Sequence, residues 1–231
     1  MPTEPSALQS KETKKSIAPM VFILIGNIAP LIGVLFFNWS VANVIILYWI
    51  ENLIIGFWTL IKMLTARGFP DKSVSFGATL FMCVFFTVHY GMFCMGHGTF
   101  ISIILDIPGA GRGFIPVKSM ISGGLITTGV LIGTLVMFVN YGISYVKDYI
   151  LSGEYKNASS HALMFSPYGH IIVVHIAVMI GAGISSFKGS PMWLMLALII
   201  GKTLIELKTT QFKARLREKN LKSPLSPNIT S

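Results

Sequence analysis

Charged residues are scarce in this sequence. They make up 12% of its 231 residues, against about 25% in a typical soluble domain. Acidic residues are the scarcest, with nine Asp and Glu against 18 Lys and Arg, while hydrophobic residues reach 53%. This composition leaves no room for a soluble catalytic module and predicts an integral membrane protein.

Cysteine is also rare, with only Cys83 and Cys94 in the chain. Both fall on one predicted helix, where a separation of eleven residues corresponds to about 16 Å at 1.5 Å per residue. A disulfide needs Cα atoms within roughly 7 Å of each other. The two cysteines therefore do not form a disulfide with each other.

Long apolar runs fill most of the chain. A helix needs roughly 20 apolar residues to cross a hydrocarbon core of about 30 Å. The runs predict an all-α fold, an integral membrane bundle of six transmembrane helices in one domain, with a polar tail at 1–16 and a basic tail at 211–231. The six predicted spans cover about 17–37, 40–64, 75–105, 118–146, 167–187 and 190–210.

The positive charges are unevenly divided between the predicted loops. With the N-terminus in the cytoplasm, fourteen Lys and Arg fall on the cytoplasmic side, and three, Arg112, Lys118 and Lys188, fall on the other. This asymmetry follows the positive-inside rule and predicts that both termini are cytoplasmic. The run QFKARLREKNLK (211–222) predicts a helix extension on anionic lipid head groups. It lacks the interleaved aromatic residues of a nucleic-acid site.

Four titratable residues lie at similar depth in four predicted helices: Glu51, His89, His175 and Lys202. Counted at 1.5 Å per residue, all four fall within a few ångströms of the bilayer middle. A charge there costs roughly 2.5 to 3.5 kcal/mol, so these side chains are expected to face inward and to meet.

Two further residues extend this polar layer. Glu206 follows Lys202 by four residues, so the two lie on one helix face and an ion pair is available. His97 follows His89 by eight residues, about 12 Å nearer the outer end. With Glu51 and Glu206 ionised, Lys202 protonated and the histidines neutral, the layer carries one net negative charge, which burial disfavours. A bound proton or cation would remove the imbalance.

The residues of this layer fall in stretches that resemble the signature of a family of bacterial multi-pass membrane proteins, the domain of unknown function family 6498. The resemblance spans about residues 20–212 and implies that Glu51, His89, His97, His175 and Lys202 occupy motif positions. It also implies a multi-pass protein of the bacterial inner (plasma) membrane, and it supplies no substrate. The stretches are YWIENLIIG (48–56), HYGMFCMGHGTF (89–100), SPYGHIIVVHI (166–176) and GKTLIELK (201–208).

A metal or cofactor site in the middle of the membrane is the first functional hypothesis. His89, His175 and Glu51 are the candidate ligands of a transition metal, or the two histidines are axial ligands of a haem, with His97 on an outer access path. The spacing matches no recognised metal motif. Whether the protein is an enzyme stays open, since an enzyme would need an open coordination position, with Glu51 as general base.

Two other hypotheses come from different classes. In a proton-linked transporter of small solutes or a permeation pathway, enclosed by one bundle or an oligomer, Glu51 and the histidines form a relay, and Lys202 and Glu206 form a switching pair. The lack of a visible internal repeat speaks against it. In a structural or assembly protein the same groups only lock helix packing, at about 0.6 to 2 kcal/mol each.

Overall fold

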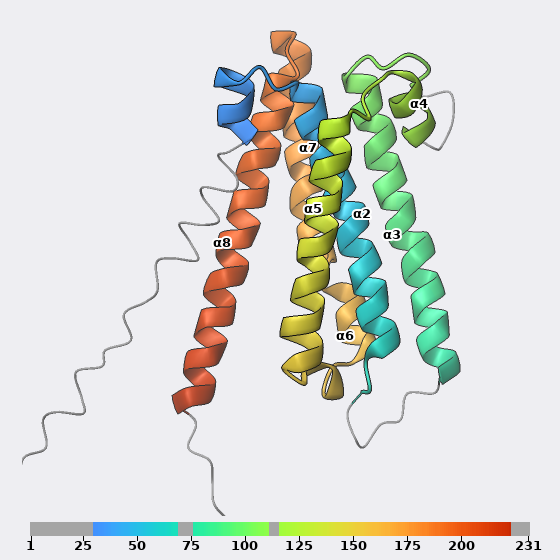
Figure 1. The fold of residues 1–231 in the computed structure, drawn as a ribbon, viewed down its shortest axis with the longest axis vertical. Coiled ribbons are helices and arrows are strands. Elements are labelled where there is room, and N and C mark those ends of the chain that lie inside the picture. Colours follow the sequence, from blue (N-terminus) through green and yellow to red (C-terminus); the bar gives the residue numbers. More distant parts are fainter. Residues whose placement is uncertain (1–29, 69–75, 111–115, 223–231) are drawn as a thin grey trace, which may run out of the picture.

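The computed structural model describes residues 30–68, 76–110 and 116–222, which form a helical bundle with no strand among them (Figure 1). The predicted polar tail at 1–16, residues 17–29 of the first predicted span and residues 223–231 of the basic tail lie outside these ranges. Residues 30–36 are helical and lie at the end of the bundle where α2 begins.

Five long helices form the bundle: α2 (Val41–Thr65), α3 (Phe76–Ile104), α5 (Thr128–Ser144), α7 (Tyr168–Lys188) and α8 (Met192–Lys222). The shorter elements are α4 (Pro116–Ser122), a π-helical segment (Tyr145–Leu151) that continues α5, a 3-10 turn (Glu154–Lys156) and α6 (Ser160–Phe165). The bounds of α2, α3 and α7 agree within one residue with the predicted spans 40–64, 75–105 and 167–187.

Four helical segments are long and apolar enough to cross a membrane, within the described part of the chain: Val41–Thr65, Phe76–Ile104, Thr128–Leu151 and Ile171–Lys188. Helix α8 is also long, but its apolar part carries three charged residues, Lys202, Glu206 and Lys208. Six spans and two cytoplasmic termini therefore remain predictions. The 31 residues of α8 extend about 46 Å, which exceeds a hydrocarbon core of about 30 Å.

The predicted span 118–146 is wrong in its first third. The chain forms the short helix α4, turns at Gly123 and Gly124, and begins α5 only at Thr128. Gly124 has φ of 69°, a left-handed conformation that glycine adopts at no steric cost. Thr127 then caps α5, because its hydroxyl accepts a hydrogen bond from the Val130 amide at 3.4 Å.

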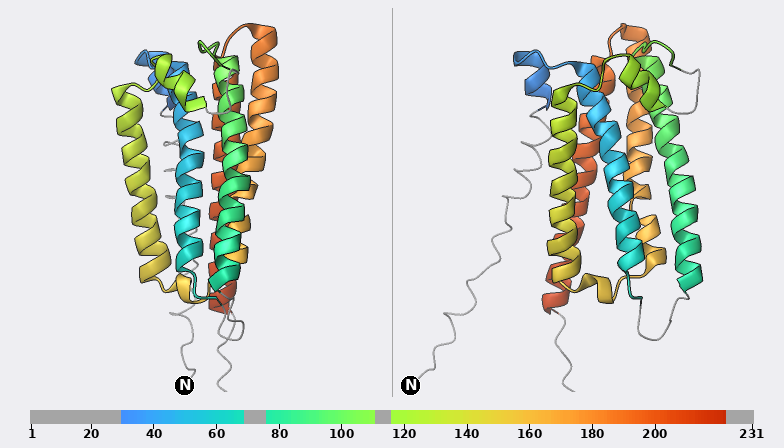
Figure 2. Two further views of the ribbon diagram at one scale, coloured as in Figure 1. Left: turned by 90° about the vertical axis from the view of Figure 1, so that its right-hand side faces the viewer. Right: turned by 45° about the vertical axis from the view of Figure 1, so that its right-hand side comes forward.

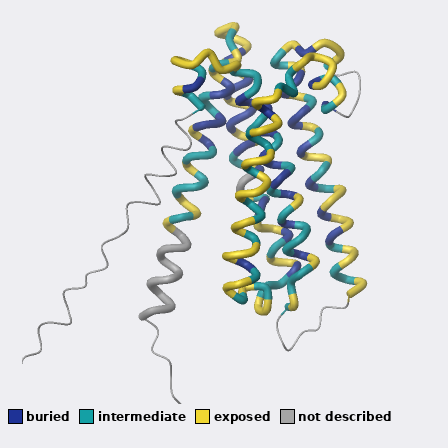
Figure 3. Tube along the Cα trace, viewed as in Figure 1, coloured by how far each residue is buried: buried dark blue, intermediate teal, exposed yellow. Residues whose placement is uncertain are grey.

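Helix α2 is the centre of the bundle and packs against α3, α5, α6 and α8 (Figure 2). Helices α7 and α8 form an antiparallel hairpin with the most extensive contact of any pair. Helix α5 lies at the periphery, and most of its residues are exposed (Figure 3). Among them are large apolar side chains such as Leu131, Leu135 and Val139, as expected for a helix that faces lipid.

The buried apolar residues form two clusters along α2. The first contains Trp49 and the preceding turns of α2, with residues of α3, α4, α5, α7 and α8. The second contains Met63 near the end of α2, with Phe86 of α3 and Met164 of α6. Glu51 and Asn52, both buried, lie on α2 between Trp49 and Met63. A polar layer thus interrupts the apolar core at the middle of the central helix.

Candidate functional site

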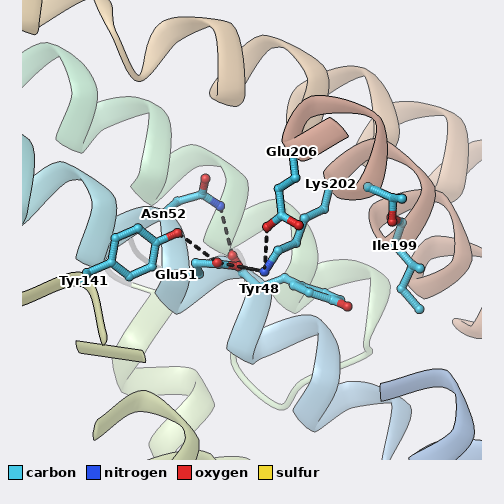
Figure 4. A network of polar contacts seen from close by, with 8 residues as sticks. Tyr48, Glu51, Asn52, Tyr141, Ile199, Lys202 and Glu206 are labelled. Atoms are coloured by element: carbon cyan, nitrogen blue, oxygen red, sulfur yellow. Dashed lines mark hydrogen bonds and ion pairs between the residues drawn. The ribbon is translucent and has the colours of Figure 1, made fainter. Parts of the chain in front are cut away.

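An ion triad joins α2 to α8 at the middle of the bundle (Figure 4). Nζ of Lys202 lies 2.7 Å from Oε1 and 2.6 Å from Oε2 of Glu51, so the ammonium group bridges both carboxylate oxygens. The same nitrogen lies 3.7 Å from Oε1 of Glu206, one turn further along α8. The contact expected from the similar depths of Glu51 and Lys202 is therefore present.

Burial differs between the two carboxylates of the ion triad. The side chain of Glu51 is 6% exposed and that of Lys202 is 17% exposed, whereas Glu206 is 31% exposed. Ionised throughout, the triad carries one net negative charge. The more deeply buried carboxylate holds the cation at hydrogen-bond distance, and the less buried carboxylate lies 3.7 Å from it.

Two tyrosines complete the surroundings of the triad. Tyr141 of α5 donates a hydrogen bond from its hydroxyl to Oε1 of Glu51 at 3.0 Å (Figure 4). Nζ of Lys202 lies 5.2 Å from the ring centroid of Tyr48, within the range of a cation–π contact. Three helices therefore contribute to the environment of Glu51, because α5 and α8 both pack on the central helix.

Side-chain to backbone hydrogen bonds fix α2 against α3 next to the triad. Nε1 of Trp49 donates to the carbonyl of Cys94 at 2.7 Å, and the hydroxyl of Tyr90 donates to the carbonyl of Asn52 at 3.1 Å. Gly98 permits this approach, since a Cβ atom there would lie 2.7 Å from the Trp49 ring. The glycine-rich stretch of α3 thus serves close packing at Gly98.

A histidine pair joins α3 to α7. Nε2 of His97 and Nδ1 of His175 lie 2.6 Å apart, which is a short hydrogen bond. One imidazole donates and the other accepts, and which does so depends on the tautomers. His97 is buried, whereas His175 is exposed on the side of α7.

The depth assigned to His89 from the sequence is wrong relative to His175. His89 lies beside Tyr168 at the start of α7, with ring centroids 5.8 Å apart, and stacks on Phe85 at 5.3 Å. The partner of His175 is His97, about 12 Å further along α3. The physical reason is the position of α6. It occupies the end of the bundle just before α7 in the chain, so α7 begins further from that end than α3 does (Figures 1 and 2).

A small cavity of about 20 Å³ lies between the ion triad and the histidine pair, and Glu51, Lys202 and His97 all line it. About 10 to 15 Å³ is enough to hold one water molecule, provided that it finds two or more polar partners. Glu51, Lys202 and His97 are such partners, and two further lining residues, Tyr48 and Asn52, each have a buried oxygen, the hydroxyl and Oδ1, that lacks a hydrogen bond within the described residues. The geometry therefore suits one water molecule between the two clusters.

Two larger cavities flank this centre. The lateral groove, about 610 Å³, lies between α3 and α7 and is lined by His89, Gly96, His97, Phe100, His175 and Met179. The vestibule, about 440 Å³, lies between α2, α5, α7 and α8 and is lined by Trp58, Lys62, Tyr141 and Lys208 among others. His97 borders both the groove and the small cavity, and Tyr141 borders the vestibule while it contacts Glu51.

The three candidate metal ligands do not gather around one point. Glu51 belongs to the ion triad, His175 to the histidine pair, and His89 lies beside Tyr168. Within the described ranges, no group of three or more His, Cys, Asp or Glu is arranged to hold a metal ion. Two imidazole nitrogens on a tetrahedral metal would lie roughly 3.4 Å apart, given metal–nitrogen distances of about 2.0 to 2.1 Å. The 2.6 Å between His97 and His175 is instead a hydrogen-bond distance.

Sequence reasoning missed the two tyrosines of the site. Tyr48 precedes Glu51 by three residues, so helical spacing alone places it on a neighbouring face of α2. Tyr141 gave no such signal, because its contact with Glu51 depends on how α5 is placed against α2.

Comparison with known proteins identifies the chain at the level of its family. The sequence model of the Family of unknown function (DUF6498) matches residues 9–224, and the chain belongs to this family. No curated protein and no solved structure matches the chain.

Proposed function

We propose that this member of the DUF6498 family is a multi-pass protein of the bacterial inner membrane that carries protons, alone or with a small solute, through its central polar layer. The observation that carries the proposal is the water-sized cavity between the ion triad and the histidine pair. It links titratable groups from α2, α3, α7 and α8, which would otherwise form two separate clusters.

The proposed path runs from the vestibule to the lateral groove. Tyr141 connects the vestibule to Glu51, because it lines the vestibule and bonds Glu51, and Lys202 joins Glu51 to Glu206. A water molecule between Glu51 and His97 would continue the path, with the hydroxyl of Tyr48 as a further partner. The path then passes to His175 at the surface of α7. With six spans and cytoplasmic termini, as the positive charges predict, the vestibule lies on the cytoplasmic side.

Lys202 is the switching group of this mechanism. It balances one of two carboxylates, so the triad is neutral only when one further proton is bound. A proton on Glu206 leaves Lys202 paired with Glu51, whereas a proton on Glu51 frees Lys202 to pair with Glu206. The two arrangements differ in whether Glu51, the carboxylate that lines the small cavity, is charged, and alternation between them would move a proton past Lys202.

Proton flux into liposomes tests the proposal. Purified protein is reconstituted with a pH-sensitive dye inside, and a potassium gradient with valinomycin supplies the driving potential. The wild type should acidify the lumen faster than protein-free liposomes. The E51Q variant should lose this flux while it keeps a hydrogen-bond acceptor for Tyr141. A matched control is E154Q, which removes an exposed carboxylate of the 3-10 turn.

Two results would contradict the proposal. Wild-type flux equal to that of empty liposomes excludes a proton pathway, and unchanged flux in E51Q excludes the path through the triad. If the variants instead lower only the thermal stability, the polar groups lock helix packing. Metal analysis of the same purified protein examines the remaining hypothesis, since a stoichiometric metal that depends on His175 would show that the histidine pair opens to bind it.

A further inference from the structure

The lateral groove contains three imidazoles in otherwise apolar surroundings. His89 and His97 come from α3 and His175 from α7, and the other lining side chains include Phe100 and Met179. Its volume of about 610 Å³ falls within the range of about 300 to 1,000 Å³ that small-molecule sites occupy. Because its lining among the described residues comes from α3 and α7 alone and His175 is exposed there, the groove opens sideways, toward lipid in a membrane.

The hydrogen bond between the two histidines determines which polar group of a ligand can bind at His175. Nδ1 of His175 is bonded to His97, which leaves Nε2 for a ligand. If Nε2 of His97 carries the shared proton, then neutral His175 has its own proton on Nε2 and acts as a donor. If Nδ1 of His175 carries it, then Nε2 is a bare acceptor. A ligand that binds in both states needs one atom that can accept a hydrogen bond from Nε2–H and can also donate one to a bare Nε2. A carboxyl oxygen does the first when it is ionised and the second when it is protonated.

We propose that the lateral groove binds a lipophilic weak acid, such as a long-chain fatty acid, with its carboxyl group at His175 and its chain along Phe100 and Met179. The chain enters from the hydrocarbon region, and the apolar lining suits it. The carboxyl group meets the only polar side chains that the described lining offers, the imidazoles. This proposal rests on the proposed function in one respect: the acid is the solute whose proton the relay accepts.

In the proposed proton transfer, the proton moves from the bound acid to His175 and from His175 to His97. The acid O–H bond breaks and a bond from the proton to Nε2 of His175 forms. The Nδ1–H bond of His175 then breaks as the proton passes to Nε2 of His97. His97 then carries a proton on both ring nitrogens, one bonded to His175 and the other to the backbone of Phe93, and it borders the small cavity. The products are the carboxylate in the groove and a protonated His97, which lies on the proposed path to Glu51.

Binding of an anthroyloxy-labelled stearic acid to the detergent-purified protein tests the proposal without any proton gradient. Gly96 lines the groove, and a Cβ atom added to it would meet no atom within 4 Å, so a side chain can start there and G96L should fill part of the groove. G91L is the matched control, since Gly91 also has open space but does not line the groove. We expect saturable binding in the wild type and G91L, and binding weakened by at least about tenfold in G96L, because the leucine occupies space that the chain of the probe needs.

Two further measurements separate the acid from other occupants. The methyl ester of the probe keeps the chain and loses the acidic proton, so it should bind about tenfold more weakly. The H175F variant should bind acid and ester equally. E51Q should bind the acid as well as the wild type does, which keeps a failure of proton flux distinct from a failure of binding.

Three outcomes would overturn this proposal. Absence of saturable binding excludes an acid site, and equal effects of G96L and G91L place the probe elsewhere. Equal binding of acid and ester in the wild type means that the groove takes a neutral amphiphile. A wild type that is dimeric while G96L is monomeric means that a second copy of the chain covers the groove.

Discussion

Loss of Lys202 should destabilise the protein far more than loss of both members of its ion pair. In K202M, Glu51 stays buried at 6% exposure without a cation, and its remaining bond comes from Tyr141. Removal of one partner from a buried pair costs about 3 to 5 kcal/mol. For a chain of this size, that corresponds to a fall in melting temperature on the order of 10 °C.

The double variant E51Q/K202M should recover most of this loss. It leaves no unpaired charge at the Glu51 position, and replacement of a complete buried ion pair by neutral groups is often close to neutral for stability. E51Q alone should cost less than K202M, because Lys202 keeps Glu206 at 3.7 Å and Gln still accepts the Tyr141 bond.

A thiol-reactive fluorogenic dye measures these melting temperatures in detergent. Cys83 and Cys94 are both free and buried, so they react only when the bundle opens. K188M is the control, since Lys188 is an exposed lysine in the last turn of α7. If K202M melts within a degree of K188M, or if the double variant melts lower than K202M, then Lys202 and Glu51 do not form a buried ion pair.

Two glycine contacts should respond to an added methyl group. A Cβ on Gly181 would lie 2.7 Å from the backbone Cα of Leu194, so G181A should force α7 from α8 and lower stability by about 1 to 3 kcal/mol in the same dye assay. G183A meets open space and should leave stability unchanged or raise it by up to about 1 kcal/mol, because Ala favours helix. G98A should also lower stability by about 1 to 3 kcal/mol, because its Cβ would meet the Trp49 ring. In the double variant G98A/W49F the smaller ring should relieve part of this loss. Stability losses that simply add in the double variant would contradict the close contact.

Hydropathy located most of the helices but could not place a break inside an apolar run. The ends of α2, α3 and α7 coincide with changes from apolar to polar sequence, which is why their bounds follow from composition. The turn at Gly123 and Gly124 lies in a stretch that contains no charged residue, so a hydropathy scale predicts one continuous span there. Only the left-handed φ of Gly124 and the cap at Thr127 reveal that the helix ends there and restarts.

Depth counting found Glu51 and Lys202 but matched the wrong histidine to His175. The count assumed that every helix starts at the membrane surface. Helix α7 does not, because α6 fills the turns below it, and the shift of about 12 Å equals the distance along α3 from His89 to His97. A sequence gives the rise along each helix, whereas the offset between helices depends on packing, which the sequence pattern alone does not contain.

The unequal exposure of the two carboxylates is compatible with the proposed proton path through a triad that has a single lysine. Two lysines would neutralise the triad permanently and leave no reason for a proton to bind. With Lys202 alone, the layer is neutral only when a proton joins it, and Glu206, at 31% exposure, is the less buried of the two carboxylates. Glu51, at 6% exposure, can exchange only through the small cavity and Tyr141. Glu51 therefore borders the small cavity and reaches the vestibule through Tyr141, and Lys202 lies between the two carboxylates.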